Sequence, residues 1–126
     1  MMTSLAYVAV GGAAGASARF LTGVGIARVL GMNPFPLGVI VVNILGSFLM
    51  GVFVVAAAHR GLTHLSPLIM TGFLGGFTTF SAFSLETVTL YERGDFGLAM
   101  MYVILSVVLS VGGLAAGLYL ARGIWA

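Results

Sequence analysis

Three hydroxyl-bearing side chains recur at intervals of four residues in an otherwise apolar stretch: Tyr102, Ser106 and Ser110. Residues four apart share a face of an α-helix, so this spacing draws one polar stripe of about 12 Å. A single serine between apolar helices serves equally well as a hydrogen bond joining two helices. Three aligned hydroxyls instead favour the lining of a path for a small polar species.

A second polar group lies in the stretch 71–87, where Gly72, Gly75 and Gly76 precede a run of threonine, serine and phenylalanine. Three glycines within five residues weaken a helix near its midpoint. A break there would free backbone carbonyls and amides, which a membrane interior tolerates only when they face protein, water or an ion. The alternative is an intact helix whose hydroxyls bond to the preceding turn.

Two phenylalanines and one asparagine extend the polar pattern. Phe80 and Phe83 are three apart and share a helix face. Aromatic edges carry partial positive charge, so two edges turned toward a path could attract an anion, although ordinary apolar packing explains them too. Asn43 offers two donors and an acceptor, and it fits either a ligand role or a hydrogen bond between helices.

Arg19 and Glu86 are the two charged residues expected within or near apolar spans. Arg19 either reaches the membrane surface as an anchor or supplies positive potential to an aqueous vestibule. Glu86 is either an interface charge or a partner for Arg19. Both interpretations remain open for each residue.

The elements that must position these groups are membrane-spanning helices. The chain has 126 residues, of which 60% are hydrophobic and 6% charged, whereas soluble domains carry about 25% charged residues. A spanning helix needs about 20 apolar residues. The sequence therefore predicts an all-α integral membrane protein, a single transmembrane domain over residues 1–126 with four helices near 5–27, 37–58, 67–91 and 96–121.

Small residues and balanced charges suggest an oligomer. Glycine, alanine and serine pairs four apart recur in the predicted helices and allow close helix packing in lipid. Four short helices leave little room to enclose a path alone. Arg60 and Arg122 fall on one side of the membrane, and Arg28 and Arg93 on the other. Because this near balance gives no orientation bias, opposite insertions could pair as an antiparallel dimer.

Several classes of function find no support in the sequence. The chain has no cysteine, which removes thiolate chemistry and cysteine metal sites. His59 and His64 have no carboxylate near them in sequence and no spacing typical of zinc. The five basic residues form no patch, so no nucleic-acid partner is expected. We expect that the protein is not an enzyme.

The stretch 72–86 resembles the third-helix signature of the Fluc (CrcB) fluoride channels of microbes. Residues 11–20 are similar to the first helix of that family, residues 41–47 to the second, and the hydroxyl stripe to the fourth. The resemblance implies an antiparallel dual-topology homodimer in a bacterial inner membrane, with the third helix broken near the midplane. It also implies two pores through which fluoride leaves the cell passively.

The resemblance further implies roles for individual residues. Phe80 and Phe83 would turn ring edges to fluoride, and Asn43 would hold the vestibule end of the path. Arg19 would make the vestibule electropositive. The carbonyls of Gly75 and Thr78 would bind a structural sodium ion on the dimer axis. The complete expected fluoride pathway consists of Asn43, Phe80, Ser81, Phe83, Tyr102, Ser106 and Ser110.

Two positions depart from the family pattern, and two other functions remain possible. Val39 and Ala82 stand where the family often has threonine, so each removes a hydroxyl from the expected path. A small proton-coupled multidrug exporter would need a central carboxylate, for which Glu86 is the candidate. A non-transporting membrane subunit would show no flux when purified.

Overall fold

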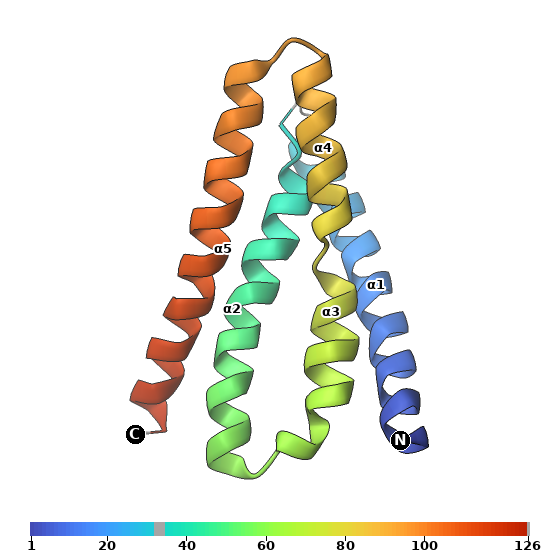
Figure 1. Cartoon of the computed structure of the whole chain (residues 1–126), viewed down its shortest axis with the longest axis vertical. Helices are drawn as coiled ribbons and strands as arrows, with labels where there is room; N and C mark the ends of the chain where they lie inside the picture. The colour runs from blue at the N-terminus through green and yellow to red at the C-terminus, as the bar shows by residue number, and fades with distance from the viewer. Residues whose placement is uncertain (32–34, 126) are drawn as a thin grey trace.

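The chain forms four helical rods that run alternately up and down, with both termini at the same end (Figure 1). The computed structural model describes residues 1–31 and 35–125. The first, second and fourth rods are the helices α1 (Met2–Leu30), α2 (Leu37–Arg60) and α5 (Phe96–Ile124). The third rod is composite: η1 (Thr63–Leu65), η2 (Pro67–Leu74), α3 (Gly75–Phe77) and α4 (Phe80–Glu92).

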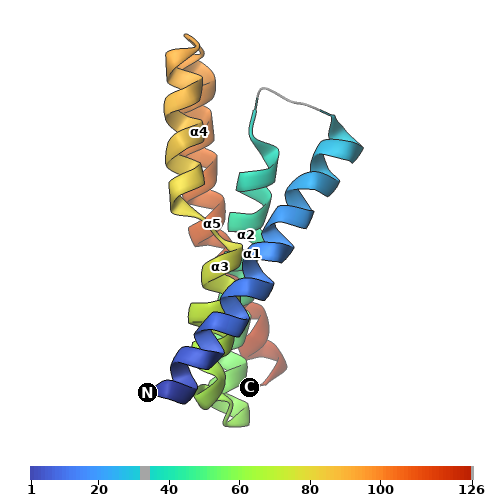
Figure 2. The same cartoon turned by 90° about the vertical axis from the view of Figure 1, so that its right-hand side faces the viewer.

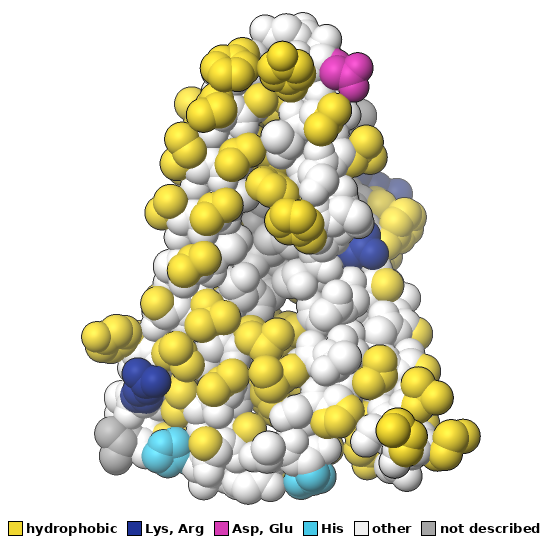
Figure 3. Space-filling model, viewed as in Figure 1, with side chains coloured by type: hydrophobic (Ala, Val, Ile, Leu, Met, Phe, Trp, Pro, Cys, Tyr) yellow, Lys and Arg dark blue, Asp and Glu magenta, His cyan; other side chains and the backbone are white. Residues whose placement is uncertain are grey.

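The predicted all-α class is confirmed, and three stretches of helix are long and apolar enough to cross a membrane: Leu37–Arg60, Thr63–Glu92 and Phe96–Ile124. The helix α1 has 29 residues but falls outside that set. Its run of glycine, alanine and serine, with two arginines, lowers its hydropathy. On the visible face of the whole molecule, apolar side chains are spread from one end to the other, and charged side chains are few (Figure 3). The protein is a multi-pass membrane protein.

Below the third rod's interruption at residues 78 and 79, the helices pack backbone against backbone. A Cβ atom added at Gly11 or Gly15 of α1 would collide with carbonyls of η2. A Cβ atom at Gly51 or Gly117 would collide in the same way between α2 and α5, which form the most extensive helix pair. These contacts explain the expected spacing of small residues, because only glycine allows the helix axes to come so close.

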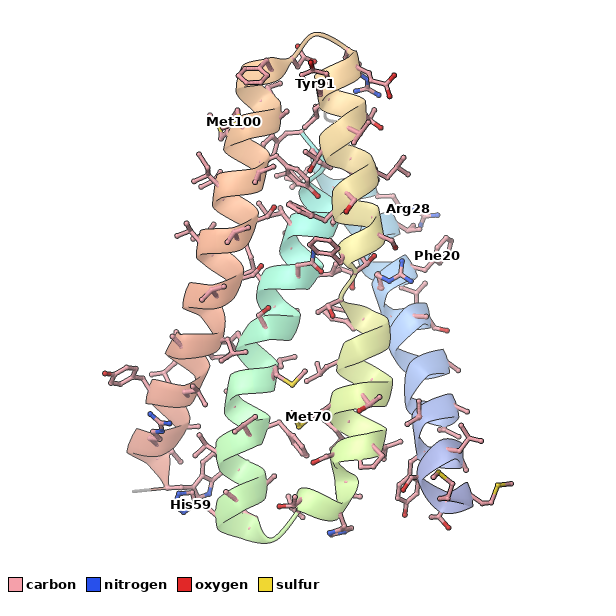
Figure 4. All side chains as sticks on the ribbon, in the orientation of Figure 1. Phe20, Arg28, His59, Met70, Tyr91 and Met100 are labelled. Carbon is pink, nitrogen blue, oxygen red and sulfur yellow. The ribbon has the colours of Figure 1, made fainter. Side chains whose placement is uncertain are left out.

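Above the interruption, α1 diverges from α4 and α5 (Figure 2). The helix α4 packs mainly on α5, while the upper part of α1 leans away from both. Phe20 projects from α1 away from the other rods (Figure 4) and is 69% exposed. Exposed apolar side chains such as Phe20 and Leu85 occur in this upper region, while Ile40, Leu90, Ala99 and Tyr102 form a buried cluster there.

Candidate functional site

The third rod is interrupted at Thr78 and Thr79, which are both extended, with φ −88° and ψ 159° at Thr78 and φ −151° and ψ 124° at Thr79. Extended residues cannot continue the ladder of helical hydrogen bonds, so nearby peptide groups need other partners. Asn43 of α2 supplies two of them. Its Nδ2 donates to the Thr79 carbonyl at 3.0 Å, and its Oδ1 accepts from the Thr79 amide at 2.8 Å.

Other side chains satisfy the peptide groups on either side of the interruption. The Nε of Arg19 donates to the Gly76 carbonyl at 3.1 Å. The hydroxyl of Thr79 accepts from the Ala82 amide at 3.1 Å and so caps the first turn of α4. The hydroxyl of Thr78 donates to the Leu74 carbonyl at 2.8 Å. The interruption is thus held by specific bonds from α1, α2 and its own threonines.

A pocket of about 280 Å³ lies beside this interruption, between α2, α4 and α5. We call it the ring pocket, and the visible face is hollowed at the corresponding height (Figure 3). Five predicted path residues meet there although they come from three helices: Asn43, Phe80, Phe83, Ser106 and Ser110. The rest of its lining consists of Ser47, Thr78, Thr79, Val107 and Val111.

Aromatic rings continue from the ring pocket toward the upper end of α5. The ring centroids of Phe80 and Phe83 are 5.5 Å apart, and those of Phe83 and Tyr102 are 5.3 Å apart. Phe35 meets Tyr102 edge-on at 5.5 Å. Tyr102 therefore does not line the ring pocket itself but touches one of its rings.

Two hydroxyls of the predicted stripe are buried without a hydrogen-bond partner among the described residues. They are Tyr102 Oη and Ser106 Oγ, on residues that are 0% and 5% exposed. Leaving a buried hydroxyl unsatisfied costs about 1–3 kcal/mol. Such groups in a native protein call for an explanation, and a bound water or ion is one. Ser106 is one of the residues that line the ring pocket, although its hydroxyl oxygen is itself buried.

Other residues that the sequence singled out lie outside the ring pocket. Ser81 is exposed, and its hydroxyl lies 3.3 Å from that of Thr79. Arg19 lines a second cavity of about 380 Å³ between α1, α2 and α4, which we call the arginine cavity. Val39 and Ala82, the two departures, line that same cavity. Glu86 borders a third cavity with Val39.

Sequence reasoning missed Thr79, which lines both the ring pocket and the arginine cavity. Its signal was available, because threonine before a run of helical residues is typical of an N-cap. Ser47, one turn beyond Asn43 on α2, also lines the ring pocket. Valines complete the lining, and no chemical signal distinguishes them from other apolar residues.

The carbonyls of Gly75 and Thr78 suit a small cation. Helix continuation would have brought them the amides of Thr79 and Ala82, but those amides donate to Asn43 and to the Thr79 hydroxyl. Among the backbone hydrogen bonds that lie outside the helices in residues 1–31 and 35–125, none ends on either carbonyl. Carbonyls freed at a helix break are sodium ligands in other membrane proteins, so the residues present fit the expected ion.

Comparisons with known proteins point in one direction. The family model described as CrcB-like protein, Camphor Resistance (CrcB), matches residues 6–118. A protein of Ruegeria sp. strain TM1040, named fluoride-specific ion channel FluC, is 63% identical over 124 residues, which is 98% of each chain. Proteins with the same name are 79% identical over 92 residues in Jannaschia sp. strain CCS1 (73% of this chain, 88% of that one) and 63% over 125 residues in Roseobacter denitrificans (98% and 99%).

Proposed function

This chain belongs to the CrcB-like family, and we propose that it is a fluoride-selective channel whose path runs through the ring pocket. Three similar proteins are named as fluoride-specific channels. A channel of this kind carries fluoride out of the cell down its gradient, across the bacterial inner membrane. It is not an enzyme, because conduction changes no covalent bond.

The observation that carries this proposal is the convergence of Asn43, two phenylalanines and two serines on one pocket. Fluoride is small and strongly hydrated, so it leaves water only where donors replace its hydration shell. Amide and hydroxyl donors and positive ring edges offer such replacement without a fixed charge that would trap the ion. Conduction requires binding that permits exit as well as entry.

The start of α4 adds to the attraction for an anion. This helix has 13 residues and begins at Phe80, beside the ring pocket. The amino end of a helix carries partial positive charge, which favours an anion there. Ser106, whose hydroxyl has no hydrogen-bond partner among the described residues, lines the same pocket from α5. The path would continue past Ser110 in one direction and toward Tyr102 in the other.

A second copy of the chain, inserted in the opposite orientation, would complete the channel. The diverging upper halves of α1 and α4 expose large apolar side chains, including Phe20, Phe80 and Leu85, which supports a partner there. A sodium ion held by the Gly75 and Thr78 carbonyls would lie between the copies. Bound there, it would offset the partial negative charge of carbonyls that no helix satisfies.

The test is ion efflux from liposomes that contain the purified protein. We expect fast fluoride efflux, little chloride efflux, and a fluoride flux at least about tenfold lower in Phe80→Ile and in Phe83→Ile, because the ring edges are lost. Phe73→Ile is the matched control, since Phe73 stacks on Phe77 below the interruption, with centroids 6.0 Å apart, and lies outside the ring pocket. Unimpaired flux in both ring-pocket variants would remove the ring-edge mechanism.

The exporter and the antiparallel arrangement have tests of their own. Proton-driven export that Glu86→Gln abolishes, without passive fluoride efflux, would support an exporter instead. The chain has no cysteine, so a single cysteine at Gly61, in the turn after α2, is a unique label site. Dual topology predicts labelling from both sides of intact vesicles, and labelling from one side alone would exclude it.

A further inference from the structure

The side-chain amide of Asn43 forms hydrogen bonds with both the backbone amide and the backbone carbonyl of Thr79, which belong to two successive peptide groups of the broken rod. It donates to the Thr79 carbonyl and accepts from the Thr79 amide, at 3.0 and 2.8 Å. The orientation of this side chain is therefore fixed by chemistry, because a backbone amide can only donate and a carbonyl can only accept. One N–H of the Asn43 amide remains, and the residue also lines the ring pocket.

A glycine on α2 makes this grip possible. Gly46 lies one turn beyond Asn43, and a Cβ atom there would collide with the Thr78 methyl group. Gly46 is buried against the interruption. The absence of a side chain lets the extended backbone approach α2 closely enough for the two bonds from Asn43. The helix α2 thus supplies both the space for the Thr79 backbone, at Gly46, and its hydrogen-bond partner, Asn43.

The gripped residue stands between two cavities. Thr79 lines the ring pocket together with Phe80 and Ser106, and it lines the arginine cavity together with Arg19. Phe80 follows it directly and begins α4. The position of the Thr79 backbone therefore determines the wall between the two cavities. It also determines the place from which the Phe80 ring projects.

We propose that Asn43 is a specificity-determining positioning residue, whose two bonds to Thr79 hold the ring pocket to a size that suits a small anion. The inference rests on the proposed fluoride path and names what gives that path its selectivity. Fluoride requires donors at short, fixed distances, whereas a larger anion is accommodated once the wall can yield. With Thr79 released, the pocket widens and discrimination against chloride falls.

The decisive variant is Asn43→Ser, whose side chain is too short to bridge both Thr79 groups. We expect the ratio of fluoride to chloride efflux to fall about tenfold, the scale of one lost hydrogen bond. Hydrogen exchange of the Thr79 amide, followed by NMR in lipid nanodiscs, should become faster by at least the same factor. Val41→Ser is the control, because it places the same residue on an exposed part of α2 and should change neither quantity.

Asn43→Asp preserves shape and separates the two bonds. Its carboxylate still accepts from the Thr79 amide, so exchange stays slow, but it cannot donate to the carbonyl, so the efflux ratio falls. This variant also serves if Asn43→Ser does not fold. An unchanged ratio in either variant, or unchanged Thr79 exchange in Asn43→Ser, would overturn the proposal. Absence of fluoride flux in the unaltered protein would instead overturn the proposed function, while the exchange measurement would still report on the grip.

Discussion

Glycines in the two halves of α1 have opposite surroundings. Gly11 and Gly15, in the lower half, lie so close to η2 that a Cβ atom at either would collide with a backbone carbonyl. Gly23 and Gly25, in the upper half, have nothing within 4 Å of an added Cβ atom. The first pair makes a helix contact within one chain, and the second pair faces open space.

This difference distinguishes two regions of the molecule. Below Thr78 and Thr79 the backbones of α1 and the third rod are in contact, and α2 is similarly close to α5. Above them α1 diverges from α4 and α5 (Figure 2), and apolar side chains of α1 and α4 such as Phe20 and Leu85 are exposed. The ring pocket lies at the boundary between these two regions, beside Thr78 and Thr79.

The largest effect is expected from placing a side chain in the closed contact. Gly15→Ala puts a methyl group against the Phe73 carbonyl, and overpacking of this kind costs about 1–3 kcal/mol. Thermal unfolding in detergent should show a clear loss of stability. Ser17→Ala is the control, because Ser17 is exposed and bonds only within its own helix, to the Ala13 carbonyl. Equal stability of the two variants would contradict the comparison between the halves.

A smaller effect is expected at the boundary. Gly46→Ala pushes on the methyl group of Thr78, a side-chain atom that can move more easily than a backbone carbonyl. We expect a cost of about 1–2 kcal/mol in stability and a larger relative loss in fluoride flux, because Asn43 is drawn away from Thr79. Efflux and thermal unfolding should be measured on the same preparation. If the loss of fluoride flux is no larger than the loss of folded protein accounts for, Gly46 is not linked to the path.

A third effect is expected at the first turn of α4. Thr79→Ala removes the oxygen that accepts from the Ala82 amide, and losing such a cap costs about 1 kcal/mol. Thr79→Ser retains that oxygen and should be close to the unaltered protein in thermal unfolding. If alanine and serine at this position give equal stability, the cap does not stabilise the start of α4.

Much of this arrangement could be predicted from the sequence. The rest depends on how the helices cross, which the sequence of one helix does not determine. Periodicity placed Ser106 and Ser110 on one face, since spacing along a single helix is a property of the sequence. That Asn43 would meet Thr79 depends on where α2 crosses the third rod, which is decided by the close approach at Gly46. Spacing within one helix carries no information about that crossing.

The partners of Asn43 and Arg19 likewise depend on how the helices pack. Asn43 was open between a ligand and a bond joining helices, and it is bonded across helices while also lining the ring pocket. Arg19 was considered as a partner for Glu86, and its hydrogen bond goes to the Gly76 carbonyl. A carbonyl freed by the interruption is a partner that only the three-dimensional path of the chain reveals. The dimer and the sodium ion stay predictions.

The smallest expected effect tests whether the upper half is open. Gly25→Ala meets nothing within 4 Å, and alanine is favoured over glycine in a helix by about 1 kcal/mol. For a single chain surrounded by detergent, thermal unfolding should therefore show a small gain in stability. A loss at this position in the assembled protein would mean that a second copy presses on this face as closely as η2 presses on Gly15. The sign of the stability change in Gly25→Ala therefore separates an uncovered surface from an interface. If the change is a loss, both halves of α1 make close contacts, and they differ only in which chain supplies the contact.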